Sequence, residues 1–340
     1  AAIAVNPSTA ALTIVSDSLP QYVDGVQLRL RTINVEVNRP GFMLNPTSCA
    51  GQGVGASITG AQGASVSVSS PFEVGGCQSL PFSPSFSAST QGKTSKAGGA
   101  SLTITVKSAA GEANIGKVDV QLPKTLPARL IPTLQDACTE AQFNANPADC
   151  PADSFVGMAT AVTPILNTPL SGPAILVSHG GAAFPDLEFL LQGENGVEIV
   201  LDGKTNIKGG ITYSKFETVP DAPISSFVTT LPEGPHSILA TDIPASAKGS
   251  LCGQSLTMPT TITAQNGKQI VQKTKITVTG CAAVKTKPLT RAQKLKRALH
   301  VCRTKYRTKS KKTKRLACEK QALNRYGPIK KSKKANRRSK

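Results

Sequence analysis

Eight cysteines and their spacing constrain the fold of this chain more than any other feature of the sequence. Sequential neighbours are 28, 12, 29 and 16 residues apart, and no two have the C-x-x-C spacing that is typical of a tetrahedral zinc site. Eight cysteines can pair in about a hundred ways. We favour sequential pairing, because each pair then closes a local unit of the chain. The expected disulfides are Cys49–Cys77, Cys138–Cys150, Cys252–Cys281 and Cys302–Cys318.

The cysteines also indicate the compartment. Disulfides persist in oxidising surroundings, so we expect an extracellular protein associated with the cell envelope. No stretch approaches the roughly 18 apolar residues of a membrane-spanning helix, so no transmembrane segment is expected. The chain begins at Ala1 without methionine and without a visible export signal. We expect it to be the C-terminal part of a longer exported protein, with further β-modules before Ala1.

The body of the chain has the composition of a β protein. The whole sequence contains no Trp, ten Phe and four Tyr, together with 29 Gly and 24 Pro. This composition favours short strands separated by turns, and the prolines argue against a doubly wound α/β core. Alternation of apolar and polar residues predicts strands over 26–37, 102–106, 118–122 and 198–201. A phase slip inside the first of these runs indicates a bulge.

Two Asn-Gly pairs predict β-hairpins, because this dipeptide favours the tight turns that connect antiparallel strands. Asn195-Gly196 separates the strand-like runs 187–191 and 197–201. Asn266-Gly267 separates the runs 260–264 and 269–278.

The segment that ends at Cys77 aligns with the segment that ends at Cys281. Both end in Gly-Cys, Gly63 aligns with Gly267, and Val74 aligns with Val278. We interpret the match as an internal repeat of a β-hairpin whose ends are tied by a disulfide. Closing such a loop contributes roughly 3 to 4 kcal/mol in the chain-entropy description.

Helices are expected in two places. Residues 134–144 form the one helical stretch of the body, where the second disulfide would pin the helix to the following loop. Near the C-terminus, Thr290 is a candidate N-cap for one helix, and Gly327-Pro328 ends a second. The Cys302–Cys318 disulfide would staple these two helices into a hairpin. Residues Lys330–Lys340 are expected to be disordered.

Together these features predict an all-β fold of tandem β-sandwich-like modules with disulfide-tied hairpins, plus a short basic C-terminal α-helical hairpin. The expected domains are a β-module with a disulfide-tied hairpin at 1–82, a central β domain with one short helix at 83–216, a second β-module repeating the hairpin at 217–283, and a strongly basic helical hairpin with a disordered tail at 284–340.

Positive charge is concentrated in residues 284–340. This segment holds 23 of the 39 lysines and arginines but only one of the 20 acidic residues, Glu319. The rest of the chain, with 16 basic and 19 acidic residues, is nearly neutral. A segment this basic is a physical reason to expect polyanion binding. The residues expected to bind polyanions are Lys294, Lys296, Arg297, Arg303, Lys305, Arg307, Lys311, Lys312, Lys314 and Arg315.

The basic segment has three interpretations: a solvated end without a partner, a nucleic-acid binder, and an anchor on the anionic envelope. Nucleic acid would be bound without specificity, because only Tyr306, Tyr326 and His300 could stack on bases and no recognition motif is present. Oxidised cysteines also place the segment outside the cytosol. We therefore expect it to bind anionic cell-wall polymers or lipid headgroups.

The sequence shows no catalytic constellation. Residues 178–181 (Ser-His-Gly-Gly) are similar to an oxyanion-hole segment, but no G-x-S-x-G nucleophile elbow accompanies them. Residues 91–94 end like a phosphate loop that lacks its first glycine. The three histidines have no partner at ligand spacing, so no metal, no cofactor and no enzyme activity are expected. His179 and Asp186 form a candidate ligand loop.

Several strings of residues are shared with a known family. They are Arg39-Pro-Gly-Phe42, Cys138-Thr-Glu-Ala-Gln-Phe143, Val177-Ser-His-Gly-Gly181, Thr290-Arg-Ala-Gln-Lys294 and Ala317-Cys318-Glu-Lys-Gln321. With them, nearly the whole chain resembles an uncharacterised family of large exported actinobacterial proteins with disulfide-tied β-modules and a basic two-cysteine C-terminal segment. The resemblance implies export and a C-terminal position in a longer precursor, and it transfers no catalytic residue.

The leading hypothesis from the sequence is a non-enzymatic structural or adhesive cell-surface protein, retained at the anionic envelope by its basic segment. The alternative is a ligand-binding module for a glycan or small molecule, centred on residues 83–216. A deep pocket lined by His179, Asp186 and neighbouring loops would favour the alternative. An enzyme whose site is assembled from residues distant in the sequence is the third hypothesis.

Overall fold

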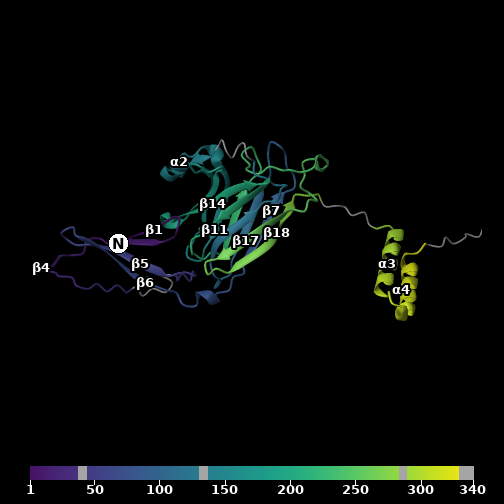
Figure 1. Cartoon of the computed structure of the whole chain (residues 1–340), viewed down its shortest axis with the longest axis horizontal. Helices are drawn as coiled ribbons and strands as arrows, with labels where there is room; N and C mark the ends of the chain where they lie inside the picture. Colours follow the sequence, from purple (N-terminus) through teal and green to yellow (C-terminus); the bar gives the residue numbers. More distant parts are fainter. Residues whose placement is uncertain (37–43, 130–136, 283–288, 329–340) are drawn as a thin grey trace, which may run out of the picture. The chain divides into compact units, whose positions relative to one another are not determined.

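The structure is a computed structural model that describes residues 1–36, 44–129, 137–282 and 289–328 (Figure 1). The chain divides into two compact units, Ala1–Cys281 and Ala282–Lys340. The division falls next to the sequence-based boundary before residue 284, where the composition becomes strongly basic. The first unit is built mainly from strands, and the described part of the second is helical.

Eleven strands of the first unit form one closed sheet, a barrel, because the last strand in the order, β13, also pairs with the first, β12. Around the ring the strands are β12 (Leu170–Ser178), β11 (Phe155–Val162), β16 (Ser226–Leu231), β8 (Leu102–Lys107), β7 (Ser85–Gln91), β18 (Gln269–Thr279), β17 (Thr257–Ala264), β9 (Ile115–Gln121), β15 (Ile211–Phe216), β14 (Glu198–Lys208) and β13 (Asp186–Gln192). An odd number of strands cannot close with alternating directions alone, and β18 with β7 is the parallel pair that closure requires. The predicted all-β class is confirmed.

The closed sheet takes the place of the tandem sandwich-like modules that the sequence pattern suggested. Strands β16, β17 and β18, from residues 217–283, pair with β8, β9 and β7, from residues 83–216. Local alternation identifies a strand but carries no information about a partner that lies far away in the sequence. The positions of single strands could therefore be predicted from the sequence, whereas the strands with which they pair could not.

The predictions for single strands and turns agree with the structure in most places. β8, β9 and β14 cover the strands expected near 102, 118 and 198, and both Asn-Gly pairs lie in hairpin connections. Gly196 and Gly267 have φ angles of 72° and 85°, in the left-handed region that favours glycine.

The single long strand predicted over 26–37 is wrong. Only Val26–Gln27 (β4) is paired there, with Tyr22–Val23 (β3), and residues 28–36 are in no strand. Among the described residues no neighbouring strand pairs with this stretch, so its backbone lacks the hydrogen bonds that would extend β4. Val37 lies outside the described residues.

All four predicted disulfides are present. Two of them tie the ends of hairpins: Cys49–Cys77 encloses β5 (Gln52–Thr59) with β6 (Ser65–Phe72), and Cys252–Cys281 encloses β17 with β18. The first hairpin is exposed over almost its whole length, whereas the second belongs to the closed sheet. The two aligned segments thus share a hairpin and a disulfide but differ in their surroundings.

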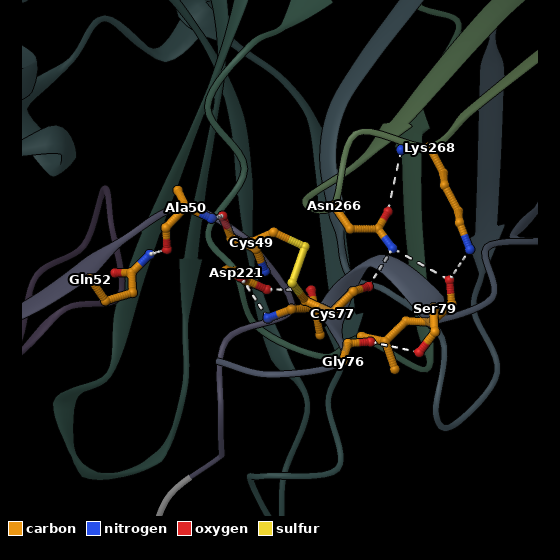
Figure 2. The surroundings of a disulfide bond; sticks show 12 residues. Cys49, Ala50, Gln52, Gly76, Cys77, Ser79, Asp221, Asn266 and Lys268 are labelled. Carbon is orange, nitrogen blue, oxygen red and sulfur yellow. Dashed lines mark hydrogen bonds between the residues drawn. A yellow bond between two sulfur atoms is a disulfide. The ribbon is translucent and has the colours of Figure 1, made fainter. Parts of the chain in front are cut away.

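Polar side chains attach the Cys49–Cys77 segment to the closed sheet (Figure 2). Beside Cys49, the Asp221 carboxylate accepts hydrogen bonds from the backbone amides of Thr47 and Ser48, both at 2.8 Å. Asn266, in the turn between β17 and β18, donates through Nδ2 to the Cys77 carbonyl at 2.9 Å. The turn residue Asn266 therefore also holds the β5–β6 hairpin on the sheet.

A segment after β9 covers part of the outer face of the closed sheet. It contains β10 (Cys138–Thr139), which pairs in parallel with β12, and helix α2 (Glu140–Ala145). The predicted helix 134–144 begins only at Glu140, because Thr139 caps it in a capping box with Gln142; residues 134–136 lie outside the described residues. Phe143 of α2 packs against outward-pointing residues of β12.

The second unit contains a helical hairpin of α3 (Arg291–Lys305) and α4 (Lys312–Tyr326), which Cys302–Cys318 joins. As predicted, Thr290 caps α3 and α4 ends at Gly327. The predicted disordered stretch Lys330–Lys340 lies outside the described residues. Among the described residues, the short 3₁₀ helices are Cys77–Ser79, Pro147–Asp149, Ala152–Ser154, Glu194–Gly196, Ala245–Ala247 and Lys309–Lys311.

Candidate functional site

The closed sheet encloses a cavity of ≈ 800 Å³. Every second residue of a strand points to the same face, so the inward residues of the strands form the wall. On β13 these are Leu187, Phe189 and Leu191, and on β14 they are Ile199 and Leu201. Other strands contribute Val106, Ile115, Val118, Val120, Leu176, Phe216 and Phe227. The volume falls within the roughly 300–1,000 Å³ of small-molecule sites.

The number of strands explains why the interior is open. The diameter of a barrel grows with strand number, and about eight strands already leave room for filling side chains or one small ligand. This sheet has eleven, and no residue of α2, α3 or α4 lines the cavity. Phe189 stacks on Phe216 and meets Phe227 edge-on, with ring centroids 5.5 Å apart in both pairs. A side chain at Gly203 would collide with the Phe216 ring, so this glycine makes room for the aromatic cluster.

Few polar groups reach the cavity. Thr205 on β14 and Ser214 on β15 lie opposite each other, and both line it. Ser214 Oγ is buried and has no hydrogen-bond partner among the described residues. Asp221 also lines the cavity, but its carboxylate already accepts hydrogen bonds from Thr47, Ser48 and Asn114. The Ser214 hydroxyl is therefore the polar group that a bound molecule would most easily engage.

An N-terminal hairpin completes the wall. Residues 203–208 of β14 pair with β15, but residues 198–202 pair only with β13. On the other side of this stretch, the Val200 amide donates to the Pro7 carbonyl at 2.9 Å. Pro7 lies between β1 (Ala2–Val5) and β2 (Leu12–Val15), and residues of both strands line the cavity. The wall at this place depends on a two-stranded hairpin and not on the closed sheet itself.

Charged residues gather on the outer face of the same strands. Glu188 of β13 and Asp202 of β14 are cross-strand partners, and neither lines the cavity. His179, directly after β12, places Nε2 at 3.4 Å from Glu188 Oε1 and at 3.7 Å from Asp186 Oδ2. Its Nδ1 lies 3.4 Å from Oε1 of Glu140, the first residue of α2. Three neighbouring strands and the covering helix thus meet at one polar cluster.

The cluster contains buried polar atoms without partners. The Glu188 side chain is 5% exposed, against 13% for Asp186 and 30% for His179. Glu188 Oε2, Asp202 Oδ1 and His179 Nε2 have no hydrogen-bond partner among the described residues. Asp186, in contrast, accepts a hydrogen bond from the Thr205 amide at 2.8 Å. Such unsatisfied buried groups are uncommon in native proteins and usually have a functional explanation.

Burial and neighbouring charge shift the pKa values of the cluster. Burial, followed by the Asp202 carboxylate, raises the pKa of Glu188 to about 7. Burial and then Asp186 raise the pKa of Asp202. Burial acts to lower the pKa of His179, but the interaction with Glu140 and the charges of Asp186 and Glu188 outweigh it, so the pKa is raised. Perturbed groups that gather in this way are typical of functional sites.

The structure places His179 and Asp186, the candidate ligand residues of the sequence, within 3.7 Å of each other. Neither lines the cavity. Sequence reasoning did not find Glu188, Asp202 and Glu140 as their neighbours. One signal was available: on β13 the acidic residues 186 and 188 alternate with apolar residues, which is the pattern of a charged outer face. That this outer face is buried beneath another segment cannot be read from the strand itself.

The ten residues expected to bind polyanions lie on the helical hairpin or its connection. All are exposed except Arg315, which is half-buried. Glu319 is the one acidic residue of the described hairpin, and its Oε1 lies 3.1 Å from Arg303 Nε. No helix of the described chain is long and apolar enough to cross a membrane.

The chain matches no protein-family model, and no curated protein or solved structure matches it. Its function therefore has to be inferred from the chemistry of the sites and not from kinship.

Proposed function

We propose that the closed sheet binds one elongated, apolar small molecule in its interior. The observation that carries this proposal is the cavity of ≈ 800 Å³, whose wall consists largely of Leu, Ile, Val and Phe side chains. Removing such surface from water on binding contributes roughly 25 cal/mol per Å². Between the structural or adhesive protein and the ligand-binding module, the apolar wall favours a module that binds a small molecule. A glycan would need hydrogen-bond partners along its length, which this wall does not offer.

The polar lining restricts the ligand further. Ser214 Oγ, unpartnered and opposite Thr205, provides one hydrogen-bonding point inside an otherwise apolar space. A molecule with an alkyl or isoprenoid body and one hydroxyl, carbonyl or carboxyl group matches this arrangement. Ser214→Ala should weaken binding of such a molecule while leaving the affinity for the corresponding hydrocarbon unchanged.

The absence of Trp from the chain allows a clean test. Leu201→Trp places a large side chain in the cavity, and Val271→Trp places the same side chain at a position of β18 that is 75% exposed. The full chain and both variants are titrated with the fluorescent fatty acid cis-parinaric acid. We expect saturable binding of one molecule by the wild type and by Val271→Trp, and binding weaker by about tenfold or more, equivalent to about 1.4 kcal/mol, in Leu201→Trp. Equal binding by all three, or none by the wild type, would refute interior binding.

We further propose that the basic helical hairpin retains the protein at an anionic surface of the cell envelope. Exposed lysines and arginines on both helices, with a single acidic residue among them, support this proposal. The four disulfides support export to an oxidising compartment. The proposal therefore keeps one part of the leading sequence hypothesis, retention at the cell surface by the basic hairpin. It changes the other part: the closed sheet is a binding module and not a purely structural or adhesive body.

Two variants that each lose three positive charges test whether the hairpin retains the protein at the envelope. One variant of the full chain changes three basic residues of the hairpin to Gln, and a control changes three exposed lysines of the closed sheet. The hairpin positions are Lys296, Arg297 and Lys314, and the control positions are Lys117, Lys273 and Lys275. On purified envelopes across a salt series, we expect weaker binding of the hairpin variant alone, and release of the wild type by salt because salt screens exposed charges. Equal binding of both variants would contradict an anchoring role.

A further inference from the structure

We propose that His179, Glu188 and Asp202 bind a divalent transition-metal ion, with Zn²⁺ as the first candidate, on the outer face of the closed sheet. The three residues follow or belong to the neighbouring strands β12, β13 and β14. One potential ligand atom of each lies within 4.8 Å of the other two. None of them lines the interior cavity, so the metal site is independent of the apolar-ligand site.

The two carboxylates would repel each other if nothing positive lay between them. Glu188 and Asp202 are directly opposite in the antiparallel pair, where like charges are destabilising. The Glu188 side chain is only 5% exposed and its Oε2 has no partner, and Asp202 Oδ1 has none either. Burial of an unpaired carboxylate is costly, and His179 can supply at most one positive charge for the two. A doubly charged ion balances both carboxylates.

The ligand atoms select the class of metal. Imidazole nitrogen with carboxylate oxygen suits Zn²⁺ and similar transition ions, whereas Ca²⁺ and Mg²⁺ prefer oxygen ligands alone. Three protein ligands with a fourth position for water are a common arrangement for Zn²⁺. With bonds of about 2.0 Å in tetrahedral geometry, neighbouring ligand atoms lie about 3.3 Å apart. The 3.4 Å between His179 Nε2 and Glu188 Oε1 matches this spacing.

Residues around the three ligands are arranged as the outer shell of a metal site. A histidine that binds a metal usually gives its other ring N–H to a carboxylate. Glu140 Oε1 lies 3.4 Å from His179 Nδ1, which leaves Nε2 for the ion. Asp186 is fixed by the Thr205 amide and places its second oxygen 3.7 Å from Nε2. Because Glu140 belongs to α2, the ion would join the covering segment to the sheet.

Isothermal titration of the full chain, made without a histidine tag and freed of metal by a chelator, tests the site. We expect the wild type to bind one Zn²⁺, and Glu188→Gln to bind it at least about a hundredfold more weakly, since loss of a ligand costs at least as much as loss of an outer-shell partner. Asp153→Asn is the matched control, because Asp153 Oδ1 lies 3.1 Å from His236 Nδ1 in an exposed pair. This control should bind like the wild type.

Three results would overturn the proposal: no binding by the wild type, an unchanged site in Glu188→Gln, or tighter binding of Ca²⁺ than of Zn²⁺. Should Glu188→Gln fail to fold, His179→Ala removes the nitrogen ligand at a partly exposed position after a strand, and should also abolish the site.

A spectroscopic measurement separates ligands from positioning residues. X-ray absorption of the Zn²⁺-loaded chain should show nitrogen and oxygen neighbours only, and sulfur among them would contradict the assignment. Glu140→Gln should keep the stoichiometry and lower the affinity about tenfold, as expected of an outer-shell residue that orients His179. An affinity equal to that of the wild type would show that Glu140 does not position the histidine.

Discussion

Strands β13 and β14 present two different buried surfaces, one on each face. Leu187, Phe189 and Leu191 point into the cavity, whereas Glu188, between them in the sequence, points outward to Asp202. The inner face is buried because the sheet closes on itself, and it is apolar apart from Thr205. On the outer face the Glu188 side chain is also buried, Glu140 of α2 lies beside its neighbour His179, and charged groups remain there without partners. The comparison teaches that a buried surface need not be a packed apolar core. The inner face has the side chains of a site for an apolar molecule, and the outer face has those of a site for a metal ion.

The largest effect is expected on the inner face. Phe189 is 3% exposed and contacts the rings of Phe216 and Phe227. Phe189→Ala should lower the free energy of unfolding by about 3–5 kcal/mol, because it removes a buried aromatic side chain that contacts two other rings. Urea denaturation measures the loss. Val271→Ala, at a position of the sheet that is 75% exposed, should change the free energy by about 0.5 kcal/mol or less, and an equal loss in both variants would contradict a closed interior.

The next effect concerns the cover of the outer face. Replacing Cys138 and Cys150 together by Ala releases the loop that holds α2 against Ile175 and Val177. For a loop of this length, we expect a loss of about 3 kcal/mol in the unfolding of the first unit, followed by urea denaturation. The same change at the Cys302–Cys318 disulfide is the control. Because that disulfide lies in the separate helical hairpin, its removal should leave the unfolding of the closed sheet unchanged, and an equal loss would show that the two units unfold together.

A smaller effect is expected from the charge of Glu188. Burial raises its pKa from an ordinary 4.5 to about 7, so the folded, metal-free chain holds this proton more tightly than the unfolded chain. The stability from this group is fully present below about pH 4.5 and is lost as the pH rises through about 7. In chelator buffer, Glu188→Gln should therefore be more stable than the wild type at about pH 8, by up to about 3 kcal/mol, and the two should be equal at about pH 4. Parallel pH profiles of the two chains would contradict the buried carboxylate.

The smallest effect concerns the start of α2. The Thr139 hydroxyl accepts a hydrogen bond from the Gln142 amide at 3.3 Å in the capping box. Thr139→Ala should cost about 1 kcal/mol in the unfolding of the first unit. Thr290→Ala removes the equivalent cap of α3 and should act on the helical hairpin alone, as monitored by helical circular dichroism. If Thr139→Ala leaves the free energy of unfolding of the first unit unchanged, the cap of α2 does not stabilise the segment that packs on the outer face of β12.

Local features of the fold could be predicted from the sequence because their causes are local. The Asn-Gly turns, the four sequential disulfides, the cap at Thr290 and the end of α4 at Gly327 all depend on a few neighbouring residues. Closure of the sheet could not be predicted. It depends on contacts such as the parallel pair β7–β18, in which Ala88 pairs with Ile276, far away in the sequence.

The outer site was partly within reach of the sequence. His179 and Asp186 were already singled out, but a two-residue turn at Asn195-Gly196 would place Glu188 opposite Gly203, one residue away from its observed partner Asp202. What the sequence does not show is that Glu188 is buried and that Glu140 of α2 lies beside His179, because α2 belongs to a distant segment. The apolar wall of the cavity was likewise invisible, since an inward apolar face looks the same whether the interior is filled or open.

The most direct test of interior binding is a methyl NMR titration of the full chain, labelled at Ile, Leu and Val, with N-phenyl-1-naphthylamine. We expect saturable shifts at Ile199 and Leu201 on the inner face of β14, with Ile175 and Val177 on the outer face of β12 unchanged. Shifts confined to the outer-face methyl groups, or no saturable shift at the inner ones, would contradict binding inside the closed sheet.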